Sequence, residues 1–572
     1  MMKSFFNLLW RFQALPEAQL IAALSRDINV NDMLATLLIQ RGITNYAKAK
    51  EYFRPDIAML HDPFLMSDMD IAVARLNKAI ENNEKILVYG DYDVDGTTAV
   101  AMMYLFIKSI HPHVEYYIPD RYAEGYGLSR LSIDYAATQG ISLMITLDCG
   151  IKSTENIKYG NEKGIDFIVC DHHTPGLELP PALAILDPKK SHCKYPYKEL
   201  SGCGVGFKLI QAYSTSHGIA WDKVVPFIEF AAISIGADIV PITGENRILT
   251  HWGIKIINDN PSPGVLAITR AAGIKKSLNI HHVVFGLAPR INAAGRIGHG
   301  SAAVKMLISP TADEAEQYAN ILNDNNSSRK DLDSHIAEEA IALIEAQPDF
   351  KNLKSSVICK PDWHKGVIGI VASRCIEKYY RPTIVLTETH GILSGSARSV
   401  AGFDVYHAIE QCADVLLQYG GHMYAAGLTL EKHNLELFKQ KFEQVVSATI
   451  TKEQQSASIQ VDMEVPFSYV NTKCFDIIKQ MEPFGPGNMT PIFCTRHVLV
   501  LPKSGVVGNN HLKLYLKDTN SGIVLDGVMW EAGHLLPKIL NKHVEIAYSI
   551  QENEYRGNVT LQLLVRDIMY KE

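Results

Sequence analysis

The chain has 572 residues, of which 47% are hydrophobic, 9% aromatic and 20% charged, a composition that excludes whole-chain disorder and provides for large buried cores. Its formal net charge of -7 excludes attraction of nucleic acid by the overall field, so any such partner needs a local basic groove. The nine cysteines are scattered without a C-x-x-C pair, which argues against a disulfide framework or a structural zinc site and favours a reducing, cytoplasmic compartment.

Residues 1–55 are predicted to form a helical segment. Apolar residues recur at three- and four-residue spacing in ALPEAQLIAALSRD and NDMLATLLIQRG, as they do on one face of a helix. The opening stretch MMKSFFNLLWRFQALPEA resembles a signal peptide, but Arg11 interrupts it and no small-residue cleavage site follows. An amphipathic first helix is therefore predicted there. No window reaches 18 consecutive apolar residues, so no membrane span is expected.

Residues 56–305 alternate between strand and helix patterns. The strand candidates are short apolar runs, namely EKILVYG, VEYYIP, SLMITLD and DFIVCD. Continuous apolar strands are typical of a parallel sheet that is covered on both faces. Helical stretches lie between them, so the pattern predicts an α/β domain with a doubly wound parallel sheet.

Three further regions follow in chain order. Residues 306–350 are polar and helix-periodic and predict a long linking helix, with an interruption near Asn323–Ser328 as an alternative. Residues 351–450 return to alternating strands and helices and predict a second α/β domain. Residues 451–572 contain short alternating strands separated by Gly, Asn and Asp turns, which predicts a small closed β-barrel with an OB-like fold as one option.

An acidic turn joins the first strand of the core to the next helix. Asp91, Asp93 and Asp95 alternate in VYGDYDVDGTT, and in an extended chain such residues project to one side. Converging carboxylates repel one another unless cations lie between them. The spelling D-x-D-x-D-G also begins an EF-hand loop, but Met102 stands where that loop needs Glu. A solvated acidic turn, or helix capping by Asp91 alone, is the alternative without a function.

More acidic residues end apolar segments farther along the chain. Asp148 closes SLMITLD, and Asp171 closes DFIVCD just before His172 and His173. Each alone suits a helix cap or a loop, but together they suit ligand binding at the carboxyl ends of strands in an open α/β sheet. Asp238 lies within AAISIGADIVP, where a buried carboxylate requires a partner.

These residues predict a metal centre. Oxygen-rich ligation with one or two imidazoles and no cysteine suits Mn²⁺ or Mg²⁺. So many carboxylates predict two divalent cations, the arrangement that clamps a phosphoryl displacement. The catalytic candidates are Asp91, Asp93, Asp95, Asp148, Asp171, His172, His173 and Asp238.

The same motifs resemble those of the DHH phosphoesterase superfamily, whose signature is the triplet Asp171-His172-His173. The core matches are VYGDYDVDG, LDCG, CDHH and GADIVP. Four further stretches resemble one branch of this superfamily, the RecJ single-strand-specific 5′→3′ DNA exonucleases. They are GLAPRINAAGRIG (286–298), HKGVIGIVASR (364–374), GGHMYAAG (420–427) and PFGPGN followed by PIF (483–493). The resemblance covers about residues 50–570. It implies a DHH core and a DHHA1 domain joined by a long helix, followed by an OB-like barrel. Ala397 is a small departure, since the family more often has Gly there.

This resemblance implies a phosphodiester hydrolase that releases 5′ mononucleotides from single-stranded DNA in recombination and repair. It implies that two Mn²⁺ or Mg²⁺ ions are held by Asp93, Asp95, Asp148, His172 and Asp238, with Asp91 and His173 completing the site. A helicase and a single-strand-binding protein are the expected protein partners.

Contacts with nucleic acid are expected from residues outside the metal centre. Arg121 suits a phosphate or, equally, a surface salt bridge. Arg290, Asn292 and Arg296 form a polar cluster in a predicted Gly/Ala-rich loop, and Arg forks match phosphate oxygens. The resemblance implies an anion-binding loop with Ser396 and Arg398, and a glycine-rich loop near the strand with Gly420, Gly421 and His422.

Two other functions remain alternatives. A small-nucleotide phosphodiesterase of the same superfamily, of the nanoRNase or cyclic-dinucleotide type, shares the metal motifs but is generally shorter and lacks a C-terminal barrel. A non-catalytic Cdc45-like nucleic-acid scaffold keeps the fold but predicts lost ligands, whereas every acidic position and both histidines are present here.

Overall fold

The computed structural model describes residues 2–555 and 557–571. The chain folds into two compact units, and each is described by itself. The first consists of Arg54–Lys330 with Pro483–Met489, and the second of Met1–Phe53, Asp331–Glu482 and Thr490–Glu572. None of the helices among the described residues combines the length and hydrophobicity that crossing a bilayer requires.

The first unit is built on a parallel sheet with the strand order β4-β3-β5-β6-β7. All four pairings are parallel. The strands are β3 (Lys85–Gly90), β4 (Val114–Tyr117), β5 (Ile141–Leu147), β6 (Asp166–Cys170) and β7 (Ala184–Leu186). The chain leaves β3 toward β4 and returns to the other side of β3 for β5, so the order reverses at β3. Such a reversal opens a crevice at the carboxyl ends of the strands.

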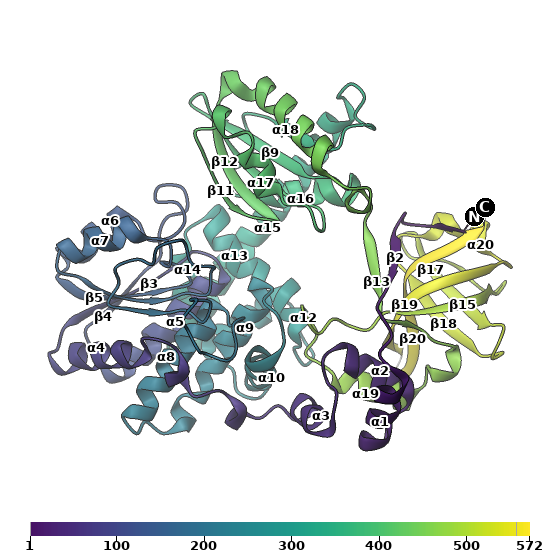
Figure 1. The fold of residues 1–572 in the computed structure, drawn as a ribbon, viewed down its shortest axis with the longest axis horizontal. Helices are drawn as coiled ribbons and strands as arrows, with labels where there is room; N and C mark the ends of the chain where they lie inside the picture. The colour runs from purple at the N-terminus through teal and green to yellow at the C-terminus, as the bar shows by residue number, and fades with distance from the viewer. Residues whose placement is uncertain (1, 556, 572) are drawn as a thin grey trace. The chain divides into compact units, whose positions relative to one another are not determined.

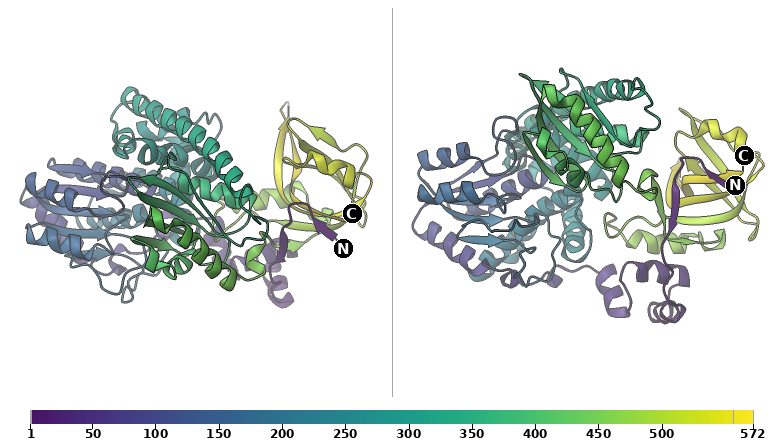
Figure 2. Two further views of the ribbon diagram at one scale, coloured as in Figure 1. Left: turned by 90° about the horizontal axis from the view of Figure 1, so that it is seen from above. Right: turned by 45° about the horizontal axis from the view of Figure 1, so that its top comes forward.

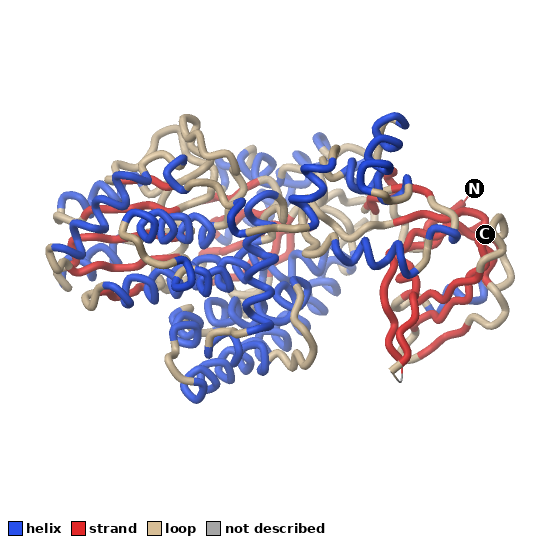
Figure 3. The backbone as a smooth tube through the Cα atoms, turned by 90° about the horizontal axis from the view of Figure 1, so that it is seen from below, coloured by secondary structure: helices blue, strands red, loops and turns tan. Residues whose placement is uncertain are grey.

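Helices cover both faces of this sheet, which confirms the predicted doubly wound fold (Figures 1 and 3). In β3, Ile86 and Val88 join a large core, whereas the alternating Leu87 and Tyr89 join a smaller one on the opposite face. The helices against the large core include α4 (Met69–Glu81), α5 (Val94–Ile110), α8 (Gly202–Ser216), α9 (Ile228–Asp238) and α10 (Gly244–Asp259). Those of the smaller core are α6 (Arg130–Thr138) and α7 (Thr154–Glu162).

More helices complete the first unit and lead out of it. They are α11 (Pro263–Ala271), α12 (Ile280–His282), a π-helical turn η5 (Val283–Leu287), α13 (Ala288–Ile297) and α14 (Ser301–Ile308). The linking helix α15 (Ala312–Glu345) then runs for 34 residues without a break (Figure 2). The alternative of an interruption near Asn323–Ser328 is wrong. Asn323 and Asn326 accept hydrogen bonds from the side chains of Arg290 and Arg329, at 3.0 and 2.6 Å, so these amides do not compete with the helix backbone.

A second α/β domain follows, with the strand order β11-β12-β10-β9-β8. Only β8 and β9 are parallel. Its elements are β8 (Ser356–Cys359), α16 (Ile368–Lys378), β9 (Thr383–Thr389), β10 (Ile392–Arg398), α17 (Val405–Glu410), β11 (Gln418–His422), β12 (Ala425–Glu431) and α18 (Leu435–Thr449). Phe438 and Phe442 of α18 are fully buried in its core.

The C-terminal region is the predicted β-barrel. Its long strands are β15 (Phe493–Val500), β17 (His511–Asp518), β18 (Val524–Met529), β19 (His543–Tyr555) and β20 (Asn558–Lys571). Short strands β14 (Met463–Glu464) and β16 (Gly505–Val507) extend the sheet, and α19 (Thr472–Gln480) precedes β15. The sheet closes through an additional pairing of β15 with β17.

The prediction of an amphipathic first helix is wrong. Before α1 (Ala18–Ile28), α2 (Asp32–Gln40) and α3 (Tyr46–Phe53), the chain forms two short strands. β1 (Met2–Ser4) pairs with β20, and β2 (Leu9–Phe12) pairs in parallel with β13 (Ser458–Val461). The buried Asp567 accepts hydrogen bonds from Trp10 Nε1 at 2.8 Å and from Ser4 Oγ at 2.5 Å. These partners lie more than five hundred residues away, so a local sequence window does not contain the signal.

A buried ion pair between α8 and α10 yields a stability prediction. Lys208 Nζ lies 3.1 Å from Glu245 Oε1, and both side chains are almost fully buried. The hydroxyl of Tyr195 and the backbone N–H of His61 also donate to Glu245, at 2.6 and 3.0 Å. We expect Lys208→Met to lower the free energy of unfolding by roughly 3–5 kcal/mol, because Glu245 is left buried without its cation.

Urea denaturation would measure this loss. The double variant Lys208→Met/Glu245→Gln is the matched control and should recover part of it, since the unpaired charge is also removed. An unfolding midpoint of Lys208→Met equal to that of the wild type would contradict the prediction.

Candidate metal centre

The acidic candidates of the first unit lie at the carboxyl ends of three neighbouring strands. Asp91 directly follows β3, Asp148 follows β5, and Asp171 follows β6 with His172 and His173 behind it. Asp238 arrives from elsewhere, as the last residue of α9. The sheet edge at the reversal of strand order therefore gathers these residues, as the sequence predicts.

The three alternating aspartates reach the site by a different geometry from the one expected. They do not lie on an extended chain, since Asp93 is the N-cap of α5 and Asp95 lies in the first turn of that helix. Asp93 Oδ1 accepts a hydrogen bond from Gly96 N at 3.1 Å. A Cβ at Gly96 would lie 2.3 Å from the carbonyl oxygen of Asp91, so only glycine lets the helix start this close to the strand end.

His172 is the point where these side chains meet. Its Nε2 lies 3.2 Å from Asp148 Oδ1, 3.6 Å from Asp238 Oδ2 and 3.7 Å from Asp95 Oδ2. Ligand atoms within 4.8 Å of one another form three groups, which are Asp148–His172–His173, Asp95–His172–Asp238 and Asp91–Asp93–Asp148. Asp148 and His172 each belong to two groups, so the geometry suits more than one cation.

Unpartnered polar atoms show that the residues fit a cation. Asp91 Oδ1, Asp148 Oδ1 and both ring nitrogens of His172 are buried without a hydrogen-bond partner among the described residues. Burial, followed by repulsion from Asp95 and Asp93, raises the pKa of Asp148 well above its usual range and that of Asp238 to about 8. Unsatisfied buried groups of this kind are rare, and a divalent cation removes both the repulsion and the missing partners.

Asp171 has a different task from the other carboxylates. Its Oδ1 accepts from His172 N at 2.8 Å and from His173 Nδ1 at 2.7 Å, and its Oδ2 accepts from Ile151 N at 2.9 Å. Burial alone would raise its pKa, but the hydrogen bond and charge of His173 lower the pKa of Asp171 to about 2. Asp171 therefore fixes the DHH turn and the ring of His173, whose Nε2 lies 3.4 Å from the hydroxyl of the exposed Tyr126.

Sequence reasoning missed the residues that surround Asp95. The backbone N–H groups of Gly202 and Cys203, at the start of α8, donate to its two oxygens at 2.7 Å each, and Ser234 Oγ donates at 2.7 Å. A Cβ at Gly202 would lie 2.6 Å from Asp148 Cβ. Gly202, Gly204 and Gly206 form the first turns of α8, and Ser201, the N-cap residue before them, was the available signal for the start of this helix.

The nucleic-acid candidates of the first unit lie on helix and loop near this edge. The Arg121 guanidinium lies 4.9 Å from the centre of the Tyr92 ring, and within the described residues it has no ion pair. The predicted Gly/Ala-rich loop of Arg290, Asn292 and Arg296 is instead helix α13. The small residues serve helix packing there, since a Cβ at Gly295 would lie 2.7 Å from the Tyr92 carbonyl oxygen.

The candidates of the second α/β domain lie on strands. Ser396 and Arg398 belong to β10, not to a loop, and Arg398 Nη1 donates to Ser396 Oγ at 3.0 Å. A Cβ at Gly369, in the first turn of α16, would lie 2.7 Å from Arg398 Nη2. The guanidinium of Arg398 thus packs against the first turn of α16, and a positive side chain beside a helix N-terminus suits an anion.

Gly420, Gly421 and His422 form the edge strand β11, so the expected glycine-rich loop is wrong here. Gly421 pairs with Ala426 at a φ of 144°, and a Cβ there would lie 2.4 Å from the Ala425 carbonyl oxygen. His422 Nδ1 accepts from Tyr424 N at 3.3 Å. Gly421 therefore permits close pairing of β11 with β12.

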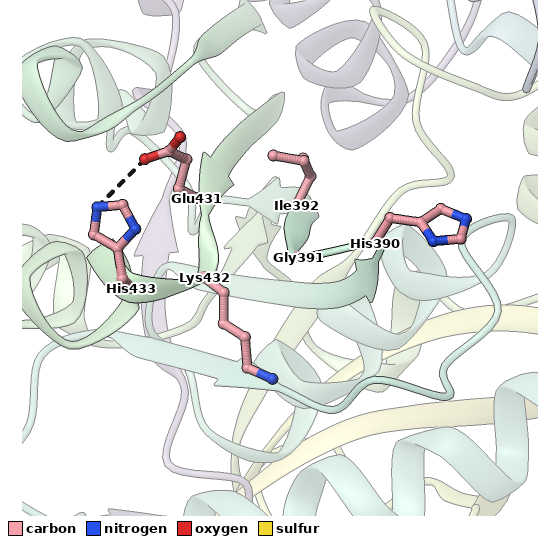
Figure 4. A pocket seen from close by; sticks show the side chains of 6 residues that line it. All are labelled: His390, Gly391, Ile392, Glu431, Lys432 and His433. Atoms are coloured by element: carbon pink, nitrogen blue, oxygen red, sulfur yellow. Dashed lines mark ion pairs between the residues drawn. The ribbon is translucent and has the colours of Figure 1, made fainter.

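A surface hollow of about 550 Å³ also occurs in this domain, lined by His390, Gly391, Ile392, Glu431, Lys432 and His433 (Figure 4). His433 Nε2 lies 3.3 Å from Glu431 Oε2, whereas the His390 side chain points away from this pair. Because the polar groups do not converge, the hollow is not a candidate site.

Known proteins resemble the chain along nearly all of its length. Three family models match it: the DHH family, N-terminal domain, over residues 85–233, the DHHA1 domain over 351–448, and the RecJ OB domain over 461–567. The chain is 33% identical to the single-stranded-DNA-specific exonuclease RecJ of Bacillus subtilis, over 98% of this chain and 71% of the relative. It is 32% identical to the RecJ of Haemophilus influenzae, over 95% of this chain and 97% of the relative.

A solved structure agrees with these relatives. RecJ from Thermus thermophilus in complex with Mn²⁺ superposes with a TM-score of 0.86 at 27% identity, covering 99% of this chain and 80% of that one.

Proposed function

The chain belongs to the RecJ family of single-stranded-DNA-specific exonucleases, and on this basis we propose that it degrades single-stranded DNA from the 5′ end. It hydrolyses phosphodiester bonds, releases 5′ mononucleotides and serves DNA recombination and repair. The observation that carries this proposal is the gathering of five carboxylates and two histidines at one sheet edge, in a chain that is 32% identical to a RecJ exonuclease over 95% of its length.

The residues of the metal centre are assigned different roles. We assign two Mn²⁺ or Mg²⁺ ions to Asp93, Asp95, Asp148, His172 and Asp238, with Asp91 beside them. When bound, such cations neutralise phosphate charge, stabilise the leaving oxygen and lower the pKa of water. His173 Nδ1 donates to Asp171 Oδ1 at 2.7 Å. Burial lowers the pKa of His173, but the hydrogen bond and charge of Asp171 raise it to about 9, so the ring is an imidazolium whose Nε2 also carries a hydrogen for a phosphate oxygen of the strand.

The remaining candidates are assigned to the strand itself. Guanidinium groups recognise phosphate by paired N–H donors. We propose that Arg121, Arg290, Asn292 and Arg296 contact the backbone of the strand, that Ser396 and Arg398 contact its 5′ phosphate, and that Gly420, Gly421 and His422 line its path. We propose the following domain boundaries: the N-terminal segment 1–55, the DHH catalytic domain 56–305, the linking helix 306–350, the DHHA1 domain 351–450 and the OB-like domain 451–572.

One oligonucleotide, labelled at either end, tests the function. With Mn²⁺ or Mg²⁺ present, the 5′ label should appear first as a mononucleotide, while the 3′ label stays on progressively shorter strands. The same sequence as a blunt duplex should resist. Degradation that begins at the 3′ end would contradict the proposal, and faster cleavage of a dinucleotide than of the long strand would favour the small-nucleotide phosphodiesterase.

Arg398 offers a test of 5′-phosphate recognition. A hydrogen bond to a charged group contributes about 1.5–3 kcal/mol, so Arg398→Ala should lower kcat/KM on a 5′-phosphorylated strand by roughly 10- to 100-fold. The same variant should act on a 5′-hydroxyl strand almost as the wild type does. Equal losses on both strands would show that Arg398 does not read the phosphate.

Partners and location complete the proposal. A strand-separating helicase is expected to supply single strands, and a single-strand-binding protein to occupy them. A DNA substrate and nine free cysteines are the grounds for a cytoplasmic location. Pull-down of each candidate protein with the tagged chain tests the two partnerships.

A further inference from the structure

Among the carboxylates assigned as ligands of the ions, that of Asp95 accepts the most hydrogen bonds from described residues. The side chain is almost completely buried, and its Oδ1 accepts from Cys203 N and Ser234 Oγ while Oδ2 accepts from Gly202 N, all at 2.7 Å. Three donors fix the rotation of the carboxylate plane, and they leave Oδ2 within 3.7 Å of His172 Nε2. Asp95 therefore presents one oxygen toward the other ligands in a set orientation.

The hydroxyl that completes this hold also contacts a second serine. Ser234 Oγ donates to Asp95 Oδ1 at 2.7 Å and lies 2.6 Å from Ser201 Oγ. The Ser201 oxygen accepts from Gly204 N at 3.1 Å and is thereby fixed at the start of α8. Ser201 therefore supports the position of the Ser234 hydroxyl beside Asp95.

Ser234 also lies on the helix that supplies another ligand. It precedes Asp238 by four residues in α9, and side chains four apart lie on the same face of a helix. Asp238 and Asp95 belong to the same ligand group, together with His172, whereas the group of Asp91, Asp93 and Asp148 contains neither. Two side chains on one face of α9 thus belong to a single cation site: Asp238 is itself a ligand, and Ser234 donates to the ligand Asp95.

We propose that Ser234, supported by Ser201, is a positioning residue for one of the two cations, the one held by Asp95, His172 and Asp238. This inference rests on the proposed metal-dependent function and adds that the two ions are supported unequally. The other ion, at Asp91, Asp93 and Asp148, has no hydroxyl of this kind behind it among the described residues. Loss of a partner that orients a metal ligand typically weakens binding by 10- to 100-fold.

The affinity of the full chain for Mn²⁺ tests the proposal without an activity assay. MnCl₂ is titrated into the protein, and binding is measured by calorimetry and by the electron paramagnetic resonance of free Mn²⁺. The wild type should bind two ions. Ser234→Ala should bind one of them unchanged and the other roughly 10- to 100-fold more weakly, whereas Ser234→Thr, which keeps the hydroxyl, should restore most of the affinity. Ser214→Ala, a buried serine farther along α8, is the matched control and should change neither site.

A double-variant cycle separates positioning from simple helix capping. If Ser201 acts on the ion only through Ser234, Ser201→Ala/Ser234→Ala should bind ions no more weakly than Ser234→Ala alone. Thermal melting of each variant verifies that it is folded. Unchanged binding in Ser234→Ala, equal weakening of both ions, or additive effects in the cycle would each overturn the inference while leaving the nuclease function standing. A wild type that binds no Mn²⁺ would overturn the metal-dependent function as well.

Discussion

Replacement of Asp148 by asparagine is expected to lower the rate of nucleotide release by roughly 10³-fold, the size of effect that follows loss of a preorganised charge at a reacting centre. Asp148 is the only carboxylate that belongs to two of the three ligand groups, and its Oδ1 lies 3.2 Å from His172 Nε2. Asparagine has the same shape but no charge, so the change removes the group most central to holding both ions.

The backbone decides which variant gives the cleaner result. Asp148 has a φ of 59°, a left-handed conformation that Asn tolerates far better than Ala. Asp148→Asn should therefore melt near the wild type, whereas Asp148→Ala adds strain to the loss of activity. Release of labelled nucleotide measures the rate, and Asp134→Asn, an exposed aspartate on α6, is the matched control. Full activity in Asp148→Asn would remove the basis of the assignment.

Chelation of divalent cations is expected to reduce nucleotide release to background, and added Mn²⁺ or Mg²⁺ to restore it. The reason lies in the unpartnered oxygens of Asp91 and Asp148 and in the raised pKa of Asp238, which burial and the neighbouring carboxylates cause. An ion that binds only the folded chain at a hundred times its Kd stabilises it by about 2.7 kcal/mol. The melting temperature should therefore rise on addition of Mn²⁺.

The same melting experiment contains its own control. Asp148→Asn should gain less stability from Mn²⁺ than the wild type, because two ligand groups have lost a charge. Undiminished hydrolysis in excess chelator, verified by metal analysis of the protein, would exclude a metal-dependent mechanism.

Much of the fold could be predicted because its signals are local. Strands β3, β5 and β6 consist mainly of apolar residues, and each contributes side chains to two cores, so the sequence shows them as short hydrophobic runs. Strands β1 and β2 could not be predicted in this way. Their stability comes from pairing with β20 and β13 and from the buried Asp567, and such distant partners override local helix periodicity.

The residues of the candidate site also differ in whether their signal is local in the sequence. Residues that end strands, such as Asp148 and Asp171, are visible in sequence because strand ends and chemistry coincide. Ser234 and Gly202 contribute through hydrogen bonds to Asp95, and nothing in their own neighbourhoods predicts that partner. Likewise, the small neighbours of Arg290 and Arg296 predict a loop, whereas helix α13 uses those small residues for close packing.

The pairing of β1 with β20, in which Met2 is opposite Lys571, has a consequence for biosynthesis. A ribosome that adds roughly 5–20 residues per second takes roughly half a minute to two minutes to pass from one strand to the other. For that whole interval β1 lacks its partner β20, so its backbone hydrogen-bonding groups are unpaired and can attract other chains. Chaperones that bind nascent chains are therefore expected to cover β1 until β20 has been synthesised.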